Sequence, residues 1–267
     1  MNRIDQRFRA LRALKQKGFI AYICAGDPNL KTTAQLARAF ENIGVDVLEL
    51  GVPFSDPLAD GIVNQLAAER GLRSGTTLKG VLKCVAALRK RGLQTPIVLY
   101  VYFNLIHRHG VKQFARDAAA AGVDGVLALD LPPEEAQAYE ESIKRAGIHP
   151  IYLVAPTTPE RRAREIARHA SGFIYYVSRE GVTGMQKTVS GTIRPMVATI
   201  RKHSRLPVAV GFGISTPRQA LAVAESADAV VVGSAIVNQI AKLGRDGQMV
   251  KKVTRFVAPM VKAVKTG

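Results

Sequence analysis

Two carboxylates stand where acid–base chemistry could take place: Glu49, inside a short apolar run, and Asp60, in the loop that follows. If the run Val-Leu-Glu-Leu-Gly is a β-strand, its side chains alternate, so that Leu48 and Leu50 face one way and Glu49 the other. The neighbouring apolar runs offer no Arg or Lys at the same depth. Burial then raises the pKa of the carboxyl group, which suits a residue that takes up a proton and releases it again. Glu49 is therefore the first candidate for a catalytic acid–base.

Residues 52–61 form a loop after this strand with the sequence Val-Pro-Phe-Ser-Asp-Pro-Leu-Ala-Asp-Gly. It is about twice as long as a usual strand-to-helix connection, and its prolines stiffen it. A stiff loop can aim Asp60 at the site of Glu49, although Asp60-Gly61 could equally be a turn. Two carboxylates in different surroundings can divide the acid and base roles between them.

Glycines follow two later apolar runs, at Gly211 and Gly213 and again at Gly233. Backbone N–H groups at glycines can approach an anion closely, and a helix that begins near Ser234 would add its positive end. The sequence therefore predicts a binding site for a phosphorylated substrate.

The polar segment of residues 179–191 carries three glycines. Such a segment is typical of a lid that closes over a site and excludes water. A disordered loop is the alternative hypothesis.

Apolar runs alternate with longer helical patterns along the whole chain. The predicted strands are residues 19–25, 46–51, 96–102, 125–130, 150–154, 172–178, 207–211 and 229–233. This pattern favours a single-domain (β/α)8 TIM barrel over residues 1–267, with an extra N-terminal helix at 1–17, ahead of an open doubly wound sheet. Chemistry in such barrels is built at the C-terminal ends of the strands. Asp46, Asp124 and Asp228 come at strand starts, so we interpret them as turn and capping groups.

The composition, with 47% hydrophobic and 22% charged residues, is that of a soluble globular protein. The sequence has no apolar stretch long enough for a membrane span and no apolar signal core, so we expect a cytoplasmic protein. Cys24 is interpreted as core packing, and His107 and His109 lack a further ligand nearby, so no metal site is predicted.

The formal net charge of +17 could indicate a partner such as RNA. Nearly all of the excess lies in residues 1–17, 79–91 and 242–265, which have the pattern of amphipathic helices. These segments have no Trp and few aromatic residues for base stacking. We therefore favour solvated helix faces over nucleic-acid binding, and keep a basic polyanion-binding protein as an alternative.

Three motifs together resemble a known family. They are the run from Glu49 to Gly61, residues 178–184, and residues 211–215 with 233–236. In these motifs, and over essentially its whole length, the chain closely resembles the tryptophan synthase alpha chain. The resemblance implies a lyase of tryptophan biosynthesis that cleaves indole-3-glycerol phosphate, by a retro-aldol reaction, to indole and glyceraldehyde 3-phosphate.

The resemblance implies that Glu49 is the general acid–base, and that Asp60 binds the indole N–H and stabilises positive charge on the protonated ring. The indole pocket would be lined by Tyr22, Tyr100, Leu127 and Phe212, with Tyr175 close by. The phosphate would be bound by Gly184, Gly213, Gly233 and Ser234, while Thr183 on the lid closes against Asp60. The sequence departs from the family pattern at Ile62 and Asn64, and at Tyr100, where an aliphatic residue is common.

The resemblance also implies a partner. A beta chain, which carries pyridoxal phosphate, would condense the indole with serine in an alpha2beta2 heterotetramer. Residues 53–60 and Asn104 would face it. No metal or cofactor is expected in this chain itself. A stand-alone indole-3-glycerol-phosphate lyase would have the same chemistry without the partner.

Overall fold

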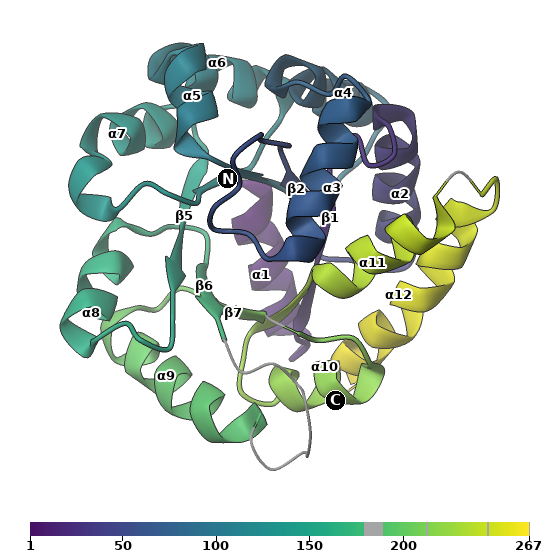
Figure 1. Cartoon of the computed structure of the whole chain (residues 1–267). Helices are drawn as coiled ribbons and strands as arrows, with labels where there is room; N and C mark the ends of the chain where they lie inside the picture. The colour runs from purple at the N-terminus through teal and green to yellow at the C-terminus, as the bar shows by residue number, and fades with distance from the viewer. Residues whose placement is uncertain (179–188, 212, 245, 267) are drawn as a thin grey trace.

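Parallel strands form a closed barrel in sequence order, with helices around it (Figure 1). The structure, a computed structural model, describes residues 1–178, 189–211, 213–244 and 246–266. The strands are β1 (Gly18–Cys24), β2 (Val47–Gly51), β3 (Ile97–Val101), β4 (Gly125–Ala128), β5 (His149–Val154), β6 (Ile174–Val177), β7 (Val208–Gly211) and β8 (Ala229–Val232). The predicted eight-stranded barrel is confirmed, since each predicted run overlaps one of these strands.

The helices lie between the strands or after β8, except for the first, which precedes β1. They are α1 (Arg3–Ala13), α2 (Leu30–Asn42), α3 (Ile62–Arg73), α4 (Leu78–Lys90), α5 (Phe103–His109), α6 (Val111–Ala121), α7 (Gln137–Arg145), α8 (Glu160–His169), α9 (Val189–His203), α10 (Pro217–Ala224), α11 (Ser234–Leu243) and α12 (Met249–Thr266), with a 3-10 turn at Pro133–Glu135. Short polar side chains begin several of them: Asn29 caps α2, and Thr77 caps α4. Within the described ranges, no helix is long and apolar enough to cross a membrane.

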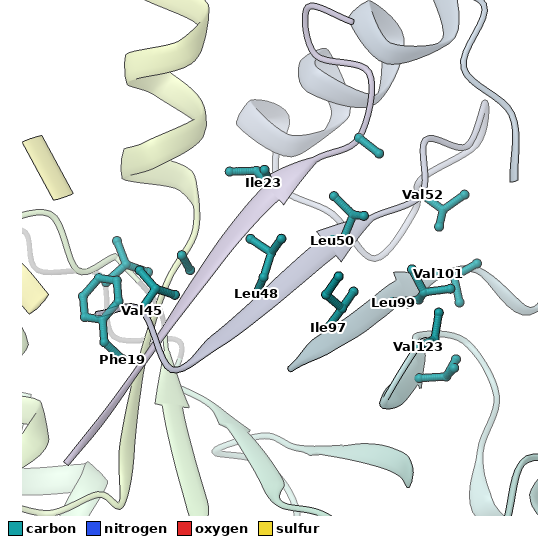
Figure 2. Packing of buried hydrophobic residues seen from close by; sticks show 14 of the residues in the cluster. Phe19, Ile23, Val45, Leu48, Leu50, Val52, Ile97, Leu99, Val101 and Val123 are labelled. Carbon is teal, nitrogen blue, oxygen red and sulfur yellow. The ribbon is translucent and has the colours of Figure 1, made fainter. Parts of the chain in front are cut away.

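The strands divide the apolar core into an outer and an inner layer. Leu48 and Leu50 belong to the outer layer, between barrel and helices, as the alternation of side chains predicts. Figure 2 shows them beside Ile97 and Leu99 of the neighbouring strand. Val47 belongs to the inner layer, on the face that Glu49 shares.

Helix α1 closes the N-terminal end of the barrel. Its buried side chains, Ile4, Phe8 and Leu11, pack against inner-layer residues, and in Figure 1 α1 lies across the middle of the ring. Leu14, the C-cap residue after α1, is 67% exposed. The inner layer therefore forms an apolar floor beneath Glu49.

Carboxylates at the strand starts bind backbone N–H groups, as the capping interpretation predicts. The carboxylate of Asp46 accepts from the Phe19 N–H at an N–O distance of 2.7 Å. The carboxylates of Asp124 and Asp228 accept from the N–H groups of Ile97 and Val208 at 2.8 Å and 2.9 Å, respectively. Each carboxylate thus joins the starts of two neighbouring strands.

Two of these carboxylates each bind two basic side chains. Arg7 and Lys265 bind Asp46, and Arg3 and Arg89 bind Asp124, at N–O distances of 2.6–3.0 Å. The interpretation of the basic segments as solvated faces is therefore incomplete, because these four cations are held at the base of the barrel.

Candidate active site

Glu49 lies in β2 on the inner face of the barrel, and the residue is only 2% exposed. Its register partners are Tyr22 on β1 and Val98 on β3. Burial is the main reason that the pKa of Glu49 is raised to about 8, and the charge of Asp60 contributes to the same rise. Among the described residues, no cation opposes this rise. Glu49 can therefore exchange a proton near neutral pH.

Asp60 lies in the loop between β2 and α3, where neutral groups hold its carboxylate. The Tyr100 hydroxyl donates to Oδ1 at 2.7 Å, and the Tyr102 hydroxyl donates to Oδ2 at 2.9 Å. The Asn64 amide lies 3.4 Å from Oδ1, and the Gln65 amide donates to the backbone carbonyl of Asp60 at 2.8 Å. The carboxylate is thus fixed in orientation without being neutralised by a cation among these contacts.

The loop itself is fastened to the end of β3. The backbone N–H of Ala59 donates to the Tyr102 hydroxyl at 2.9 Å, and the Phe54 ring stacks on the Tyr102 ring with centroids 5.1 Å apart. These contacts favour the stiff-loop interpretation of residues 52–61 over a simple turn at Asp60-Gly61.

Tyr22 connects the parts of the site. It pairs with Glu49 in the strand register, and its ring lies edge-on to Tyr100 with centroids 5.0 Å apart. Its hydroxyl lies so close to Gly51 that a Cβ atom there would be 2.5 Å away. A Cβ atom at Gly233 would lie 3.4 Å from the Tyr22 side chain. The C-terminal end of β8 therefore borders the same opening of the barrel as the C-terminal ends of β1, β2 and β3.

Two further predicted residues lie on the inner face. Burial raises the pKa of the Tyr175 phenol, and the charge of Glu49 raises it further, so Tyr175 faces the same interior. Its hydroxyl would lie 2.8 Å from a Cβ atom at Gly211. Leu127 is buried in the inner layer and is the register partner of Tyr100.

Backbone groups suited to an anion lie at the ends of β7 and β8. Gly213 has a φ of +66°, a conformation that glycine adopts without strain. Gly233 precedes α11, whose first residue is Ser234, as predicted. Unpaired N–H groups at such a helix start attract an anion.

Three predicted site residues, Thr183, Gly184 and Phe212, lie outside the described residues, as does most of the predicted lid at 179–191. Their roles stay predictions. Within the described part of the chain, no group of three or more His, Cys, Asp or Glu side chains could hold a metal ion. Cys24 is buried beside Tyr22 and Ala67, which agrees with core packing.

The sequence interpretation missed Tyr102, and it noted Asn64 only as a departure from the family pattern. Tyr102 follows Tyr100 by two positions, so the strand alternation that selected Glu49 could also have selected Tyr102. The contact of Asn64 with Asp60 depends on how the loop enters α3, which spacing alone does not specify.

Comparison with known proteins gives consistent results. The family model described as tryptophan synthase alpha chain matches residues 8–265. The tryptophan synthase alpha chain of Opitutus terrae is 50% identical over 266 residues, which cover 99% of this chain and 100% of the relative. The tryptophan synthase alpha chain of Caulobacter sp. strain K31 is 47% identical, and the match covers 99% of this chain and 97% of the relative.

Solved structures agree with the sequence matches. Tryptophan synthase subunit alpha from Legionella pneumophila str. Paris superimposes with a TM-score of 0.91 at 38% identity, covering 99% of this chain and 98% of that chain. A structure of the tryptophan synthase a2b2 complex from Pyrococcus furiosus gives a TM-score of 0.85 at 36% identity, covering 92% and 99%. The chain therefore belongs to the tryptophan synthase alpha chain family.

Proposed function

We propose that Glu49 and Asp60 are the catalytic residues of this chain. As a member of its family, the chain is a lyase that acts on indole-3-glycerol phosphate in tryptophan biosynthesis. The observation that carries the proposal is the burial of the Glu49 carboxyl group at the end of the barrel that Asp60 borders. Among the described residues, no cation compensates this burial.

In the proposed reaction, the carbon–carbon bond between the indole ring and the glycerol chain breaks. A proton is added to ring carbon C3, and a proton leaves the glycerol hydroxyl next to the breaking bond. The electron pair of that bond returns to the protonated ring, so indole and glyceraldehyde 3-phosphate leave with no net change in protons. Glu49 is the group that takes and gives these protons, and its raised pKa makes both forms accessible near neutral pH.

Asp60 accepts the indole N–H and stabilises the positive charge that ring protonation creates. Its neutral hydrogen-bond partners, Tyr100 and Tyr102, support this role because they orient the carboxylate and leave its charge in place. Gly213, Gly233 and Ser234 bind the phosphate through their backbone N–H groups. Acid–base chemistry suffices for both proton transfers, so we propose that this chain uses no cofactor.

We also propose that the chain works in the cytoplasm with a beta chain that carries pyridoxal phosphate, in an alpha2beta2 heterotetramer. Leu58, within the loop that bears Asp60, is 83% exposed, and Ile62, directly after that loop, is 66% exposed. Exposed apolar side chains that lie close together are typical of protein interfaces. The structure from Pyrococcus furiosus is described as a tryptophan synthase a2b2 complex, which supports the same assembly here.

The experiment is to measure indole formation from indole-3-glycerol phosphate by the purified chain, with and without a beta chain. We expect indole in both cases, and faster formation with the partner. Equal rates would favour a stand-alone lyase. Absence of indole with the partner present would contradict the proposed function.

A further inference from the structure

The Tyr100 hydroxyl makes one of the shortest contacts in the site. It donates to Oδ1 of Asp60 at 2.7 Å. Tyr102 also contacts the loop that bears Asp60. Its hydroxyl accepts a hydrogen bond from the Ala59 N–H, and its ring stacks on Phe54, so Tyr102 positions the loop as well as the carboxylate. Asp60 is the one hydrogen-bond partner that the described residues offer to the Tyr100 hydroxyl.

The Tyr100 side chain is itself firmly held. It projects into the barrel from β3, where its register partners are Gly51 on β2 and Leu127 on β4. Gly51 has no side chain, and the Tyr22 ring takes the space above it and meets the Tyr100 ring edge-on. Burial and the charge of Asp60 raise the pKa of the Tyr100 phenol well above its ordinary value, so the hydroxyl remains a donor.

The donors around Asp60 leave little freedom to its carboxylate. An ionised carboxylate has about four lone-pair positions. Tyr100 and Asn64 approach Oδ1, whereas Tyr102 approaches Oδ2. The acceptor capacity that remains lies on Oδ2. The side chain therefore presents one oxygen to an incoming N–H group.

We propose that Tyr100 is a positioning residue of this enzyme, which fixes the Asp60 carboxylate through Oδ1 so that Oδ2 accepts the indole N–H. This inference rests on the proposed function, since it requires Asp60 to act on the substrate. Charge on the indole ring develops only after protonation, so loss of this positioning lowers kcat more than it changes KM.

The test compares Tyr100→Phe with the parent enzyme, in the alpha2beta2 complex, with indole-3-glycerol phosphate as substrate. Phe keeps the ring and its contact with Tyr22 and removes only the hydroxyl. We expect kcat to fall about 10- to 100-fold, the range for a hydrogen bond to a charged group, with KM changed less than about twofold.

Tyr152→Phe is the matched control. Its hydroxyl donates to Glu140 at 2.6 Å on the outer side of β5, so this variant also loses a buried tyrosine–carboxylate hydrogen bond. We expect its kcat to remain at the parent value. An equal loss of kcat in both variants would overturn the inference, because the effect of Tyr100 would then be merely structural.

A double-mutant cycle with Asp60→Asn completes the test. If Tyr100 acts through Asp60, Tyr100→Phe changes kcat by less than about twofold once Asp60 is Asn. A full loss in that background, or parent kcat for the single variant Tyr100→Phe, overturns the inference and leaves the proposed function intact. Parent kcat for Asp60→Asn alone overturns the proposed role of Asp60, and the inference falls with it.

Discussion

Buried carboxylates at the two ends of the barrel differ in whether cations compensate their burial. Asp46, just before β2, is 1% exposed and binds Arg7, Lys265 and a backbone N–H. Glu49, three positions further along the same chain segment, is 2% exposed and has no cation among the described residues to offset its burial. A buried carboxylate is therefore compensated by cations at Asp46 and is left without such compensation, among the described residues, at Glu49.

The difference follows from the energetics of burying charge. A carboxylate that leaves water loses solvation free energy, and ion pairs with hydrogen bonds can restore it. At Asp46 that compensation is present. At Glu49 the loss remains and is expressed as a pKa raised to about 8, which keeps a proton within reach near neutral pH.

The largest effect is expected for catalysis. Glu49→Gln removes the proton acceptor and keeps the shape of the side chain, so we expect indole formation to fall about 10³-fold. Steady-state assay of the variant in complex with a beta chain measures the loss. A rate within a few-fold of the parent would show that Glu49 is not the acid–base.

The next effect is expected at the other end of the strand. Asp46→Ala leaves Lys265 and Arg7 without their buried partner, so we expect the free energy of unfolding to fall by about 3 kcal/mol, measured by urea denaturation. We also expect kcat of the folded enzyme to stay at the parent value. A stable variant that has lost activity would contradict the division between the two ends.

The change in stability over a single pH unit is expected to be smaller than the effect of Asp46→Ala. The pKa of Glu49 is raised from 4.5 to about 8 on folding, so the folded state binds the proton more tightly than the unfolded state. Stability from this group is fully present below about pH 4.5 and is lost as pH rises to about 8, by about 1.4 kcal/mol per pH unit. Urea denaturation of parent and Glu49→Gln at several pH values should show this slope in their difference. Parallel curves would contradict it.

The smallest effect on stability is expected for the more exposed ion pair between Arg201 and Asp228, at the N-terminal end of the barrel. Arg201 lies 3.1 Å from Asp228, and the two side chains are 46% and 36% exposed. We expect Arg201→Ala to change the free energy of unfolding by less than about 1 kcal/mol. A loss as large as that of Asp46→Ala would mean that burial does not distinguish these pairs.

Local patterns were sufficient to predict the barrel and the inward position of Glu49. Both depend on period-two alternation and on strands that recur between helical segments, which a sequence shows directly. The prolines of the loop before Asp60 likewise predicted a stiff loop.

Contacts between distant segments could not be predicted in this way. Asp46 and Lys265 are 219 positions apart, and Arg3 and Asp124 are 121 apart, so no local pattern links them. The hydrogen bonds from Tyr100 and Tyr102 to Asp60 span 40 and 42 positions and depend on how the loop folds back over β3. The raised pKa of Glu49 was expected from burial, but its size depends also on the position of Asp60.

The most direct measurement is a titration of Glu49 itself. Carbon-13 NMR of the glutamate carboxyl groups, compared between the parent chain and Glu49→Gln, identifies the resonance that belongs to Glu49. We predict a midpoint near pH 8, well above the ordinary value of 4.5. A midpoint near 4.5 would mean that the Glu49 carboxylate is compensated like Asp46, and would contradict the contrast between the two ends of the barrel.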